Sequence, residues 1–199
     1  MLKVRVLPIL LIQDGLLKKP IQFKNPRTVA NPISIARVFE ERQVDELILL
    51  DRGKTLEDED IDPYLVVDIA EELYVPFAFG GGISNIQSMK DIIQAGAEKV
   101  VINTFAVQNP KLIREGANKF GSQCIVVSID YKKKNEQNLV YINSGKTKTN
   151  TSVIEFSKQM QDMGSGEILL TSIDKDGTML GYDYNTLKKV KKNLTIPII

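Results

Sequence analysis

The chain has no histidine and no tryptophan among its 199 residues, and it has a single cysteine. Without histidine it lacks the commonest acid–base catalyst and metal ligand, so proton transfer falls to carboxylates, lysines and tyrosines. One cysteine excludes a disulfide framework, and the apolar run that begins at Cys124 predicts a buried core thiol. We expect neither a metal site nor a cofactor.

The sequence also lacks a strong excess of charge and a long apolar run. Its 26 basic and 25 acidic residues give a net charge of +1, so no global field attracts nucleic acid or an anionic membrane. No run reaches the ~18 apolar residues of a membrane span. The N-terminal apolar run follows Lys3 and Arg5 closely and has no small-residue cleavage site. These features predict a cytoplasmic protein without nucleic-acid or membrane partners.

What the chain does contain is a repeated alternation of apolar runs and amphipathic segments. Runs of Val, Ile and Leu without polar alternation predict strands that are buried on both faces, and strand–helix alternation predicts parallel strands with helices outside. The expected strands are 4–12, 46–51, 75–79, 99–103, 124–130 and 167–171, with a further strand opening at 196–199. The expected helices are 31–43, 66–73, 84–96, 110–120, 153–163 and 184–193.

An internal repeat bears on the fold class. The segment Asp45–Asp51 resembles Gly166–Ser172 at an offset of 121 residues. Two similar halves, about 1–121 and 122–199, predict a single α/β domain of the (β/α)₈ TIM-barrel class, with strands seven and eight incomplete or missing. An open doubly wound sheet of six or seven strands is the alternative.

Two polar connections and three helix starts complete this outline. The connection Gln13–Ala30 exceeds ordinary loop lengths, which is typical of lids and binding loops, and the excursion 131–150 contains a small hairpin at 139–142. Asn31–Pro32 and Asn109–Pro110 predict a capping residue followed by proline, and Ser84–Gln87 fits a capping box.

Polar residues at the ends of the parallel strands are the first place to look for a site. Gly80–Gly82 and the pair Asn103–Thr104 end neighbouring strands, where glycine backbone and free amides favour a phosphate. A tight strand-to-helix turn uses the same glycines. The acidic turn Asp174–Thr178 is too short for a calcium loop and is either structural or part of the same site.

Two groups of charged residues have both a structural and a functional interpretation. Asp51 and Asp130 end buried strands, where each carboxylate either bonds to neighbouring loops or acts in acid–base chemistry. At the opposite ends of the strands stand Arg5, Glu46, Lys99 and Glu167. These four charges would form either a salt-bridge ring or a gate over a channel.

Taken together, these residues resemble the HisF family, the cyclase subunits of imidazole glycerol phosphate synthase in histidine biosynthesis. The resemblance is strongest in 45–51, 77–83, 96–104, 120–130, 144–145 and 164–182. It implies a barrel that docks a glutaminase (HisH-like) subunit on its N-terminal face. Ammonia from that subunit would cross the barrel and react with phosphoribulosyl-formimino aminoimidazole carboxamide ribotide, a substrate with two phosphates. The products would be imidazole glycerol phosphate and an aminoimidazole carboxamide ribotide.

The resemblance also implies roles for individual residues. Asp130 would be a catalytic carboxylate, and Lys19 would close over the substrate. One phosphate site would use Gly82, Asn103 and Thr104, and the other Asp176 and Gly177; the remaining substrate-binding residues would be Asp51, Ser144, Gly145 and Thr171. Arg5, Glu46, Lys99 and Glu167 match the charges of the family's ammonia gate.

One departure from the family pattern concerns the chemistry itself. The family's second catalytic aspartate, at the end of the first strand, corresponds here to Leu11, which cannot transfer a proton. Asp14 lies three residues further along, and Ala78 and Val101 replace small hydroxyl residues. Three functions follow: a cyclase subunit with weakened catalysis, an ammonia-channelling paralogue for nucleotide-sugar amidation in surface-polysaccharide synthesis, or a non-catalytic scaffold for a glutaminase.

Overall fold

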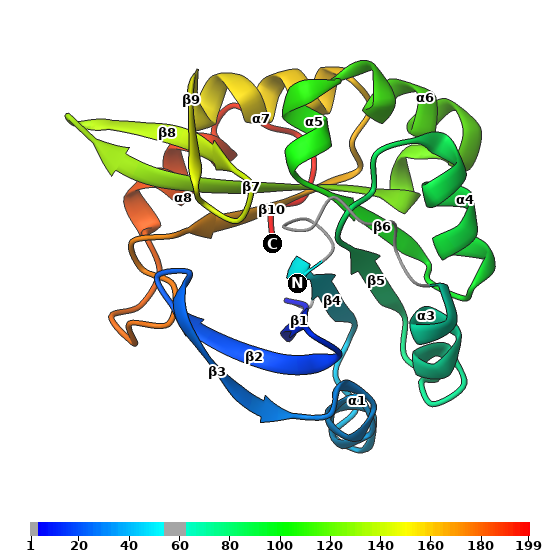
Figure 1. Ribbon diagram of the computed structural model, residues 1–199. Coiled ribbons are helices and arrows are strands. Elements are labelled where there is room, and N and C mark those ends of the chain that lie inside the picture. The colour runs from blue at the N-terminus through cyan, green and yellow to red at the C-terminus, as the bar shows by residue number, and fades with distance from the viewer. Residues whose placement is uncertain (1–3, 54–62) are drawn as a thin grey trace. The chain divides into compact units, whose positions relative to one another are not determined.

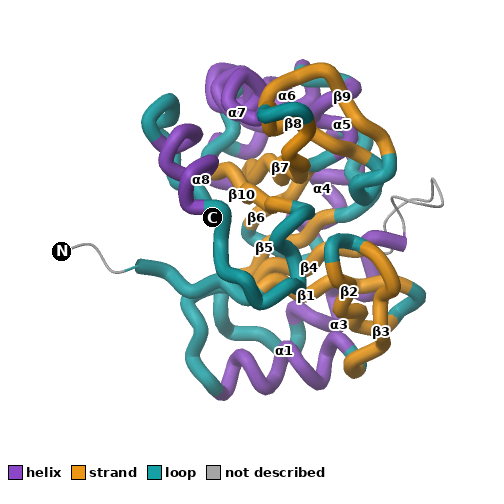
Figure 2. The backbone as a smooth tube through the Cα atoms, turned by 90° about the vertical axis from the view of Figure 1, so that its left-hand side faces the viewer, coloured by secondary structure: helices purple, strands orange, loops and turns teal. Residues whose placement is uncertain are grey.

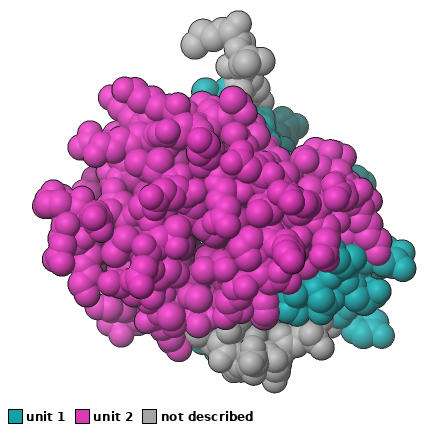
Figure 3. Space-filling view, turned by 90° about the horizontal axis from the view of Figure 1, so that it is seen from above, with its two compact units in different colours: residues 1–19, 27–101 teal, residues 20–26, 102–199 magenta. Residues whose placement is uncertain are grey.

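The computed structural model describes residues 4–53 and 63–199. They form two compact units, Met1–Lys19 with Arg27–Val101, and Pro20–Pro26 with Ile102–Ile199, which are coloured separately in Figure 3.

The first unit is built on parallel strands, as expected. They are β1 (Ile9–Gln13), β4 (Leu47–Asp51), β5 (Phe77–Gly80) and β6 (Lys99–Ile102), and each pairs in parallel with the next. Leu47, Ile48 and Phe79 are completely buried, because these apolar runs are covered on both faces. The helices α1 (Pro32–Glu41), α3 (Pro63–Ala70) and α4 (Ile86–Gln94) follow β3, β4 and β5 in the chain and lie along the strands in Figure 1.

The second unit combines a parallel pair with an antiparallel extension. β7 (Ile125–Lys134) pairs in parallel with β10 (Glu167–Ser172), and antiparallel with β8 (Gln137–Ile142), which continues into β9 (Thr147–Ser152). The helical elements are α5 (Thr104–Gln108), α6 (Lys111–Phe120), the short 3₁₀ helix η1 (Ser122–Cys124), α7 (Val153–Asp162) and α8 (Tyr184–Lys191). A parallel bridge between Ile168 and Ile198 confirms the strand opening at 196–199. The fold is thus an alternating α/β arrangement with a largely parallel sheet.

Of the three expected helix starts, the structure confirms the one at Asn31 and corrects those at Ser84 and Asn109. Asn31 caps α1 by accepting from the amides of Ile33 and Ser34, as expected. The cap of α4 is Asn85 rather than Ser84: its extended backbone brings the side-chain oxygen 2.9 Å from the Ser88 amide. Asn109 does not cap α6; the cap position is Pro110, with no side-chain hydrogen bond.

The first strand is shorter than expected. β1 begins at Ile9 rather than at residue 4, and the side chains of Val4 and Val6 are 82% and 64% exposed. The Val6 amide donates to the Asp45 carboxylate at 2.9 Å instead of to a backbone carbonyl of a neighbouring strand. Pro8, two residues later, has no amide hydrogen to donate.

The long connection Gln13–Ala30 is a hairpin arm and not a loop. It contains β2 (Leu16–Ile21) and β3 (Lys24–Ala30), drawn as strands in Figure 2. Asp14 and Gly15 have φ values of 54° and 68°, and the tight turn they form pairs Gln13 with Leu16. Two consecutive positive φ values match the twist of a two-residue hairpin, so the chain folds back at once.

Two smaller expectations are also corrected. The hairpin expected at 139–142 is one strand of a larger sheet, because β7 continues to Lys134 and β8 pairs on both sides. Cys124 is half-buried at the end of η1 rather than in the core, since β7 begins only at Ile125.

Candidate functional site

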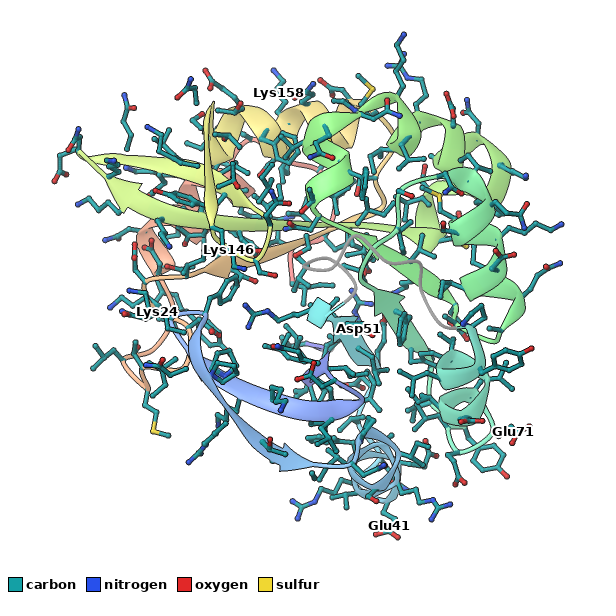
Figure 4. The ribbon with its side chains drawn as sticks, in the orientation of Figure 1. Lys24, Glu41, Asp51, Glu71, Lys146 and Lys158 are labelled. Carbon is teal, nitrogen blue, oxygen red and sulfur yellow. The ribbon has the colours of Figure 1, made fainter. Side chains whose placement is uncertain are left out.

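In the first unit, the carboxyl end of β4 brings Asp51 against a glycine turn. Asp51 lies opposite Ile12 of β1, is buried, and accepts from the Gly53 amide at 2.9 Å; Figure 4 labels it. Gly81 has a φ of 127°, and a Cβ there would lie 2.1 Å from the Asp51 carbonyl oxygen. Only glycine fits this contact, so the turn that contains Gly82 is fixed against the end of β4.

Two residues with expected roles lie on the β1–β2 arm of the same unit. Leu11 is half-buried in β1, opposite Leu50 of β4. Lys19 is exposed on β2. Asp14 stands in the turn between these strands, with one carboxylate oxygen 3.8 Å from the Lys18 ammonium. Asp14 therefore belongs to the turn and not to the end of β1.

In the second unit, β7 holds Asp130 in a defined orientation, close to the last residue that pairs in parallel with β10. The side chain is 8% exposed, and its Oδ2 accepts from Asn103 Nδ2 at 3.2 Å. The same amide nitrogen donates to the Ser128 carbonyl at 2.9 Å. A buried carboxylate with a fixed amide donor is held in one orientation, as an acid–base group requires.

The neighbouring residues expected to bind phosphate are linked to Asp130 by hydrogen bonds. The Thr104 hydroxyl accepts from the Asn143 amide at 3.1 Å and lies 3.3 Å from Asn103 Oδ1. This contact orders the β8–β9 turn, where Ser144 and Gly145 have φ values of 54° and 77°. Thr171 of β10 lies directly opposite Asp130 in the strand register. The second unit thus gathers Asn103, Thr104, Asp130, Thr171 and the 144–145 turn.

The tip of the hairpin arm lies on the loop after β10. The Gln22 amide donates to the Asp176 carbonyl at 2.9 Å, and its side chain donates to the Asp174 carbonyl at 2.9 Å. Gly177 has a φ of 68°, and a Cβ there would lie 2.6 Å from the Pro20 carbonyl oxygen. The tip therefore sits where the resemblance expects a substrate phosphate, and glycine permits the close approach.

Nothing in the sequence predicts that Gln22 and Phe23, the two residues at the tip of the hairpin arm, lie beside the candidate site. A Cβ on Gly145 would lie 3.1 Å from the Phe23 ring, so Phe23 packs beside the 144–145 turn, which Lys146 follows in Figure 4. Positive φ values at Gln22 and Phe23 define the tip. Glutamine and phenylalanine are not residue types that predict such a turn. Of the residues in this contact, only Gly145 was expected from the sequence to belong to the site.

At the amino ends of the strands of the first unit, Arg5, Glu46 and Lys99 meet. Glu46 is 4% exposed and receives Arg5 Nη1 at 3.0 Å and Lys99 Nζ at 2.8 Å. Glu167, the fourth residue, is buried at the start of β10 in the second unit. The cluster pairs a buried carboxylate with two cations, so at least three of these charges form a structural network.

We expect Lys99→Met to lower the free energy of unfolding by about 1–3 kcal/mol, because it removes a charged donor from the buried Glu46 carboxylate while Arg5 stays. Denaturant unfolding measures the loss. Lys158→Met, at an exposed position of α7 labelled in Figure 4, is the matched control and should cost less than about 0.5 kcal/mol. Equal losses in both variants would contradict a stabilising role for the cluster.

The residue after Asp130 also lies in a hydrogen-bonded position. The Tyr131 side chain is 3% exposed, and its hydroxyl donates to Asp183 Oδ2 at 3.2 Å. Burial, aided by the Asp183 charge, raises the pKa of Tyr131 to about 12. Burial would raise the pKa of Asp183 as well, but the hydroxyl and amide of Thr186 and the Tyr131 hydroxyl bring that pKa below its usual value.

The raised pKa of Tyr131 predicts a loss of stability at high pH. Between about pH 10 and pH 12 the unfolded chain releases this proton while the folded chain keeps it, so stability falls as pH rises, by up to about 3 kcal/mol. Tyr131→Phe lacks this proton. Urea unfolding at about pH 9 and pH 11 should show a steeper loss in the original chain, and equal slopes would contradict the assignment.

The described residues contain no group of three or more His, Cys, Asp or Glu side chains that could hold a metal ion. Within residues 4–53 and 63–199, no helix has the length and apolar character to cross a membrane.

The chain is similar in sequence to known proteins. Residues 5–199 match the family described as histidine biosynthesis protein. The chain is 45% identical to the imidazole glycerol phosphate synthase subunit HisF of Leptospira biflexa over 197 residues, which are 98% of this chain and 77% of the relative. It is 44% and 42% identical to the HisF subunits of Hydrogenobaculum sp. and Bacillus cereus over 200 residues, with 100% of this chain and 79% of each relative covered. The chain therefore belongs to the histidine biosynthesis protein family.

Proposed function

We propose that this chain is a cyclase subunit of imidazole glycerol phosphate synthase, a cytoplasmic lyase of histidine biosynthesis. It would use ammonia to convert phosphoribulosyl-formimino aminoimidazole carboxamide ribotide into imidazole glycerol phosphate and an aminoimidazole carboxamide ribotide. The proposal is supported by HisF relatives at 42–45% identity along nearly the whole chain. We also propose that its sheet belongs to the family's (β/α)₈ barrel, to which these residues contribute the first six strand–helix units.

The observation on which this proposal depends most is the Asp130 carboxylate. It lies in β7 close to the last residue that pairs in parallel with β10, is almost buried, and is oriented by Asn103. In the proposed reaction Asp130 takes a proton from the attacking ammonia nitrogen and returns one to the leaving ribotide nitrogen, so the carboxylate is regenerated. Leu11 provides no second proton-transfer group, so the proposed reaction is slower than one with two carboxylates.

The two phosphates are assigned to the remaining strand ends. One is proposed to meet Gly82, Asn103 and Thr104, and the other Asp176 and Gly177 after the hairpin tip withdraws. Lys19, exposed on the hairpin arm, would then supply a cation to the bound substrate. Asp51, Ser144, Gly145 and Thr171 complete the proposed substrate-binding set.

The partner is proposed to be a HisH-like glutaminase that docks where the parallel strands begin. The printed names of the relatives describe subunits, which agrees with a heteromeric enzyme. Arg5, Glu46 and Lys99 lie at these strand ends, and with Glu167 they are the proposed ammonia gate. The close pairing of Glu46 with two cations would have to loosen for ammonia to pass.

A second candidate function is ammonia delivery to a different acceptor, such as a nucleotide sugar. It is favoured by Leu11 and by two buried apolar residues, Ala78 and Val101. Ala78 lies in β5, and Val101 of β6 pairs with Gly80 in the strand register. An acceptor that needs only one proton-transfer group would tolerate these residues.

Steady-state turnover of the bis-phosphate ribotide by the full-length protein distinguishes the two candidates. Turnover should rise with ammonium chloride alone, and with glutamine only when the glutaminase is added. A protein that binds the glutaminase and stimulates glutamine hydrolysis, yet leaves the ribotide unchanged at saturating ammonia, would contradict the cyclase proposal and favour another acceptor.

A further inference from the structure

The side chain next to the catalytic candidate points away from it. Successive side chains of a strand alternate between its two faces, so Asp130 and Tyr131 face opposite sides of β7. The Tyr131 side chain is buried, and its hydroxyl donates to a carboxylate oxygen of Asp183 at 3.2 Å. Asp183 is 52 residues further along the chain, where it caps α8.

Asp183 is itself held in place. Its carboxylate accepts from the Thr186 amide at 3.2 Å and from the Thr186 hydroxyl at 2.6 Å. Asn138 of β8 donates to that hydroxyl oxygen at 2.7 Å. The acceptor of the Tyr131 hydroxyl is thus a fixed carboxylate, and a hydrogen bond to a charged group is among the strong ones.

Tyr131 holds the loop after β10 at both of its ends. At the start of the loop, the Ile173 amide donates to the Tyr131 carbonyl at 2.9 Å. At the end of the loop, Asp183 accepts from the Tyr131 hydroxyl. The eleven-residue stretch 173–183 contains Asp176 and Gly177, and Tyr131 ties both of its ends to β7.

We propose that Tyr131 is a positioning residue, which fixes the 173–183 loop, and with it Asp176 and Gly177, against the part of β7 that bears Asp130. The inference rests on the proposed function, in which that loop meets a substrate phosphate. The lowered pKa of Asp183 agrees with an ionised acceptor at neutral pH. Phenylalanine at position 131 keeps the ring and the backbone contact but releases the far end of the loop.

The test compares Tyr131→Phe with a matched tyrosine in the full-length protein. Tyr184, at the start of α8, is 60% exposed, and it contacts Tyr182 through its ring and its backbone amide, so Tyr184→Phe removes a hydroxyl without untying the loop. Amide hydrogen exchange of residues 173–178 is measured, together with KM and kcat for the bis-phosphate ribotide at saturating ammonia.

For Tyr131→Phe we expect exchange in 173–178 to accelerate about tenfold, and KM to rise about tenfold while kcat changes less than about twofold. Tyr184→Phe should match the original chain. Asp183→Ala should accelerate exchange in 173–178 and raise KM as Tyr131→Phe does. Asp183→Asn, whose side chain can still cap α8 and accept from Tyr131, should stay closer to the original chain in both quantities. In the Asp183→Ala background, Tyr131→Phe should add nothing further.

Unchanged exchange in 173–178 would overturn the inference, as would accelerated exchange throughout the chain with a large drop in melting temperature, because the residue would then be only structural. Failure of the proposed function has a different signature. The original chain would then show no turnover, while the exchange of the loop still reports whether Tyr131 holds it.

Discussion

Leu11→Asp is expected to raise ammonia-dependent turnover of the bis-phosphate ribotide by about a hundredfold in the full-length protein. The substitution returns a carboxylate to the position in β1 where the HisF resemblance expects one. The site is half-buried, opposite Leu50, so a carboxylate there retains contact with water and can ionise. Initial rates at saturating ammonium chloride measure the gain.

Leu11→Asn is the matched control for this gain. Asparagine has nearly the size and polarity of aspartate but cannot take up a proton, so its rate should stay within about threefold of the original. If both variants gain equally, polarity of the pocket and not proton transfer limits the reaction. If neither gains, Leu11 does not occupy a catalytic position in this chain.

Asp130→Asn is expected to lower turnover about a thousandfold. The amide keeps the shape of the side chain, but it cannot exchange a proton as the carboxylate does. Since Leu11 contributes none either, no carboxylate remains at either expected catalytic position. The rates of the original chain and the variant, compared at the same substrate and ammonia concentrations, give the effect as a difference in activation free energy.

Asp174→Asn controls for the change of charge near this strand. Asp174 is exposed in the loop after β10, and its carboxylate accepts from the Lys133 amide at 2.9 Å. Its turnover should remain within about twofold, and both variants should melt within a few degrees of the original chain. A thousandfold loss in Asp174→Asn, or a normal rate in Asp130→Asn, would remove Asp130 from the mechanism.

Buried apolar runs made the parallel strands predictable. The segments Leu47–Asp51 and Phe77–Gly80 have almost no polar residue, and a strand covered on both faces needs none. The hairpin arm was missed because β2 contains Lys18, Lys19 and Pro20 and buries only two side chains. The Asp14–Gly15 pair was the available signal, since this dipeptide is common in two-residue hairpin turns.

The candidate site was predictable only as a set of strand ends. Asp130 and Asn103 could be expected near one another, because the sequence predicts both at the ends of parallel strands, whereas the 3.2 Å hydrogen bond depends on a rotamer that no pattern reveals. The bond from Tyr131 to Asp183 joins residues on either side of two hairpin strands, a helix and a parallel strand. Its prediction would require knowing where the 173–183 loop ends.

The account depends most on the claim that ammonia nitrogen enters the imidazole ring on this protein. The direct measurement is mass spectrometry of the products after the full-length protein is incubated with the bis-phosphate ribotide and ¹⁵N-labelled ammonium chloride. We predict imidazole glycerol phosphate with the heavy nitrogen in its ring, and an unlabelled aminoimidazole carboxamide ribotide. Intact ribotide, or products without the label, would contradict the proposed function.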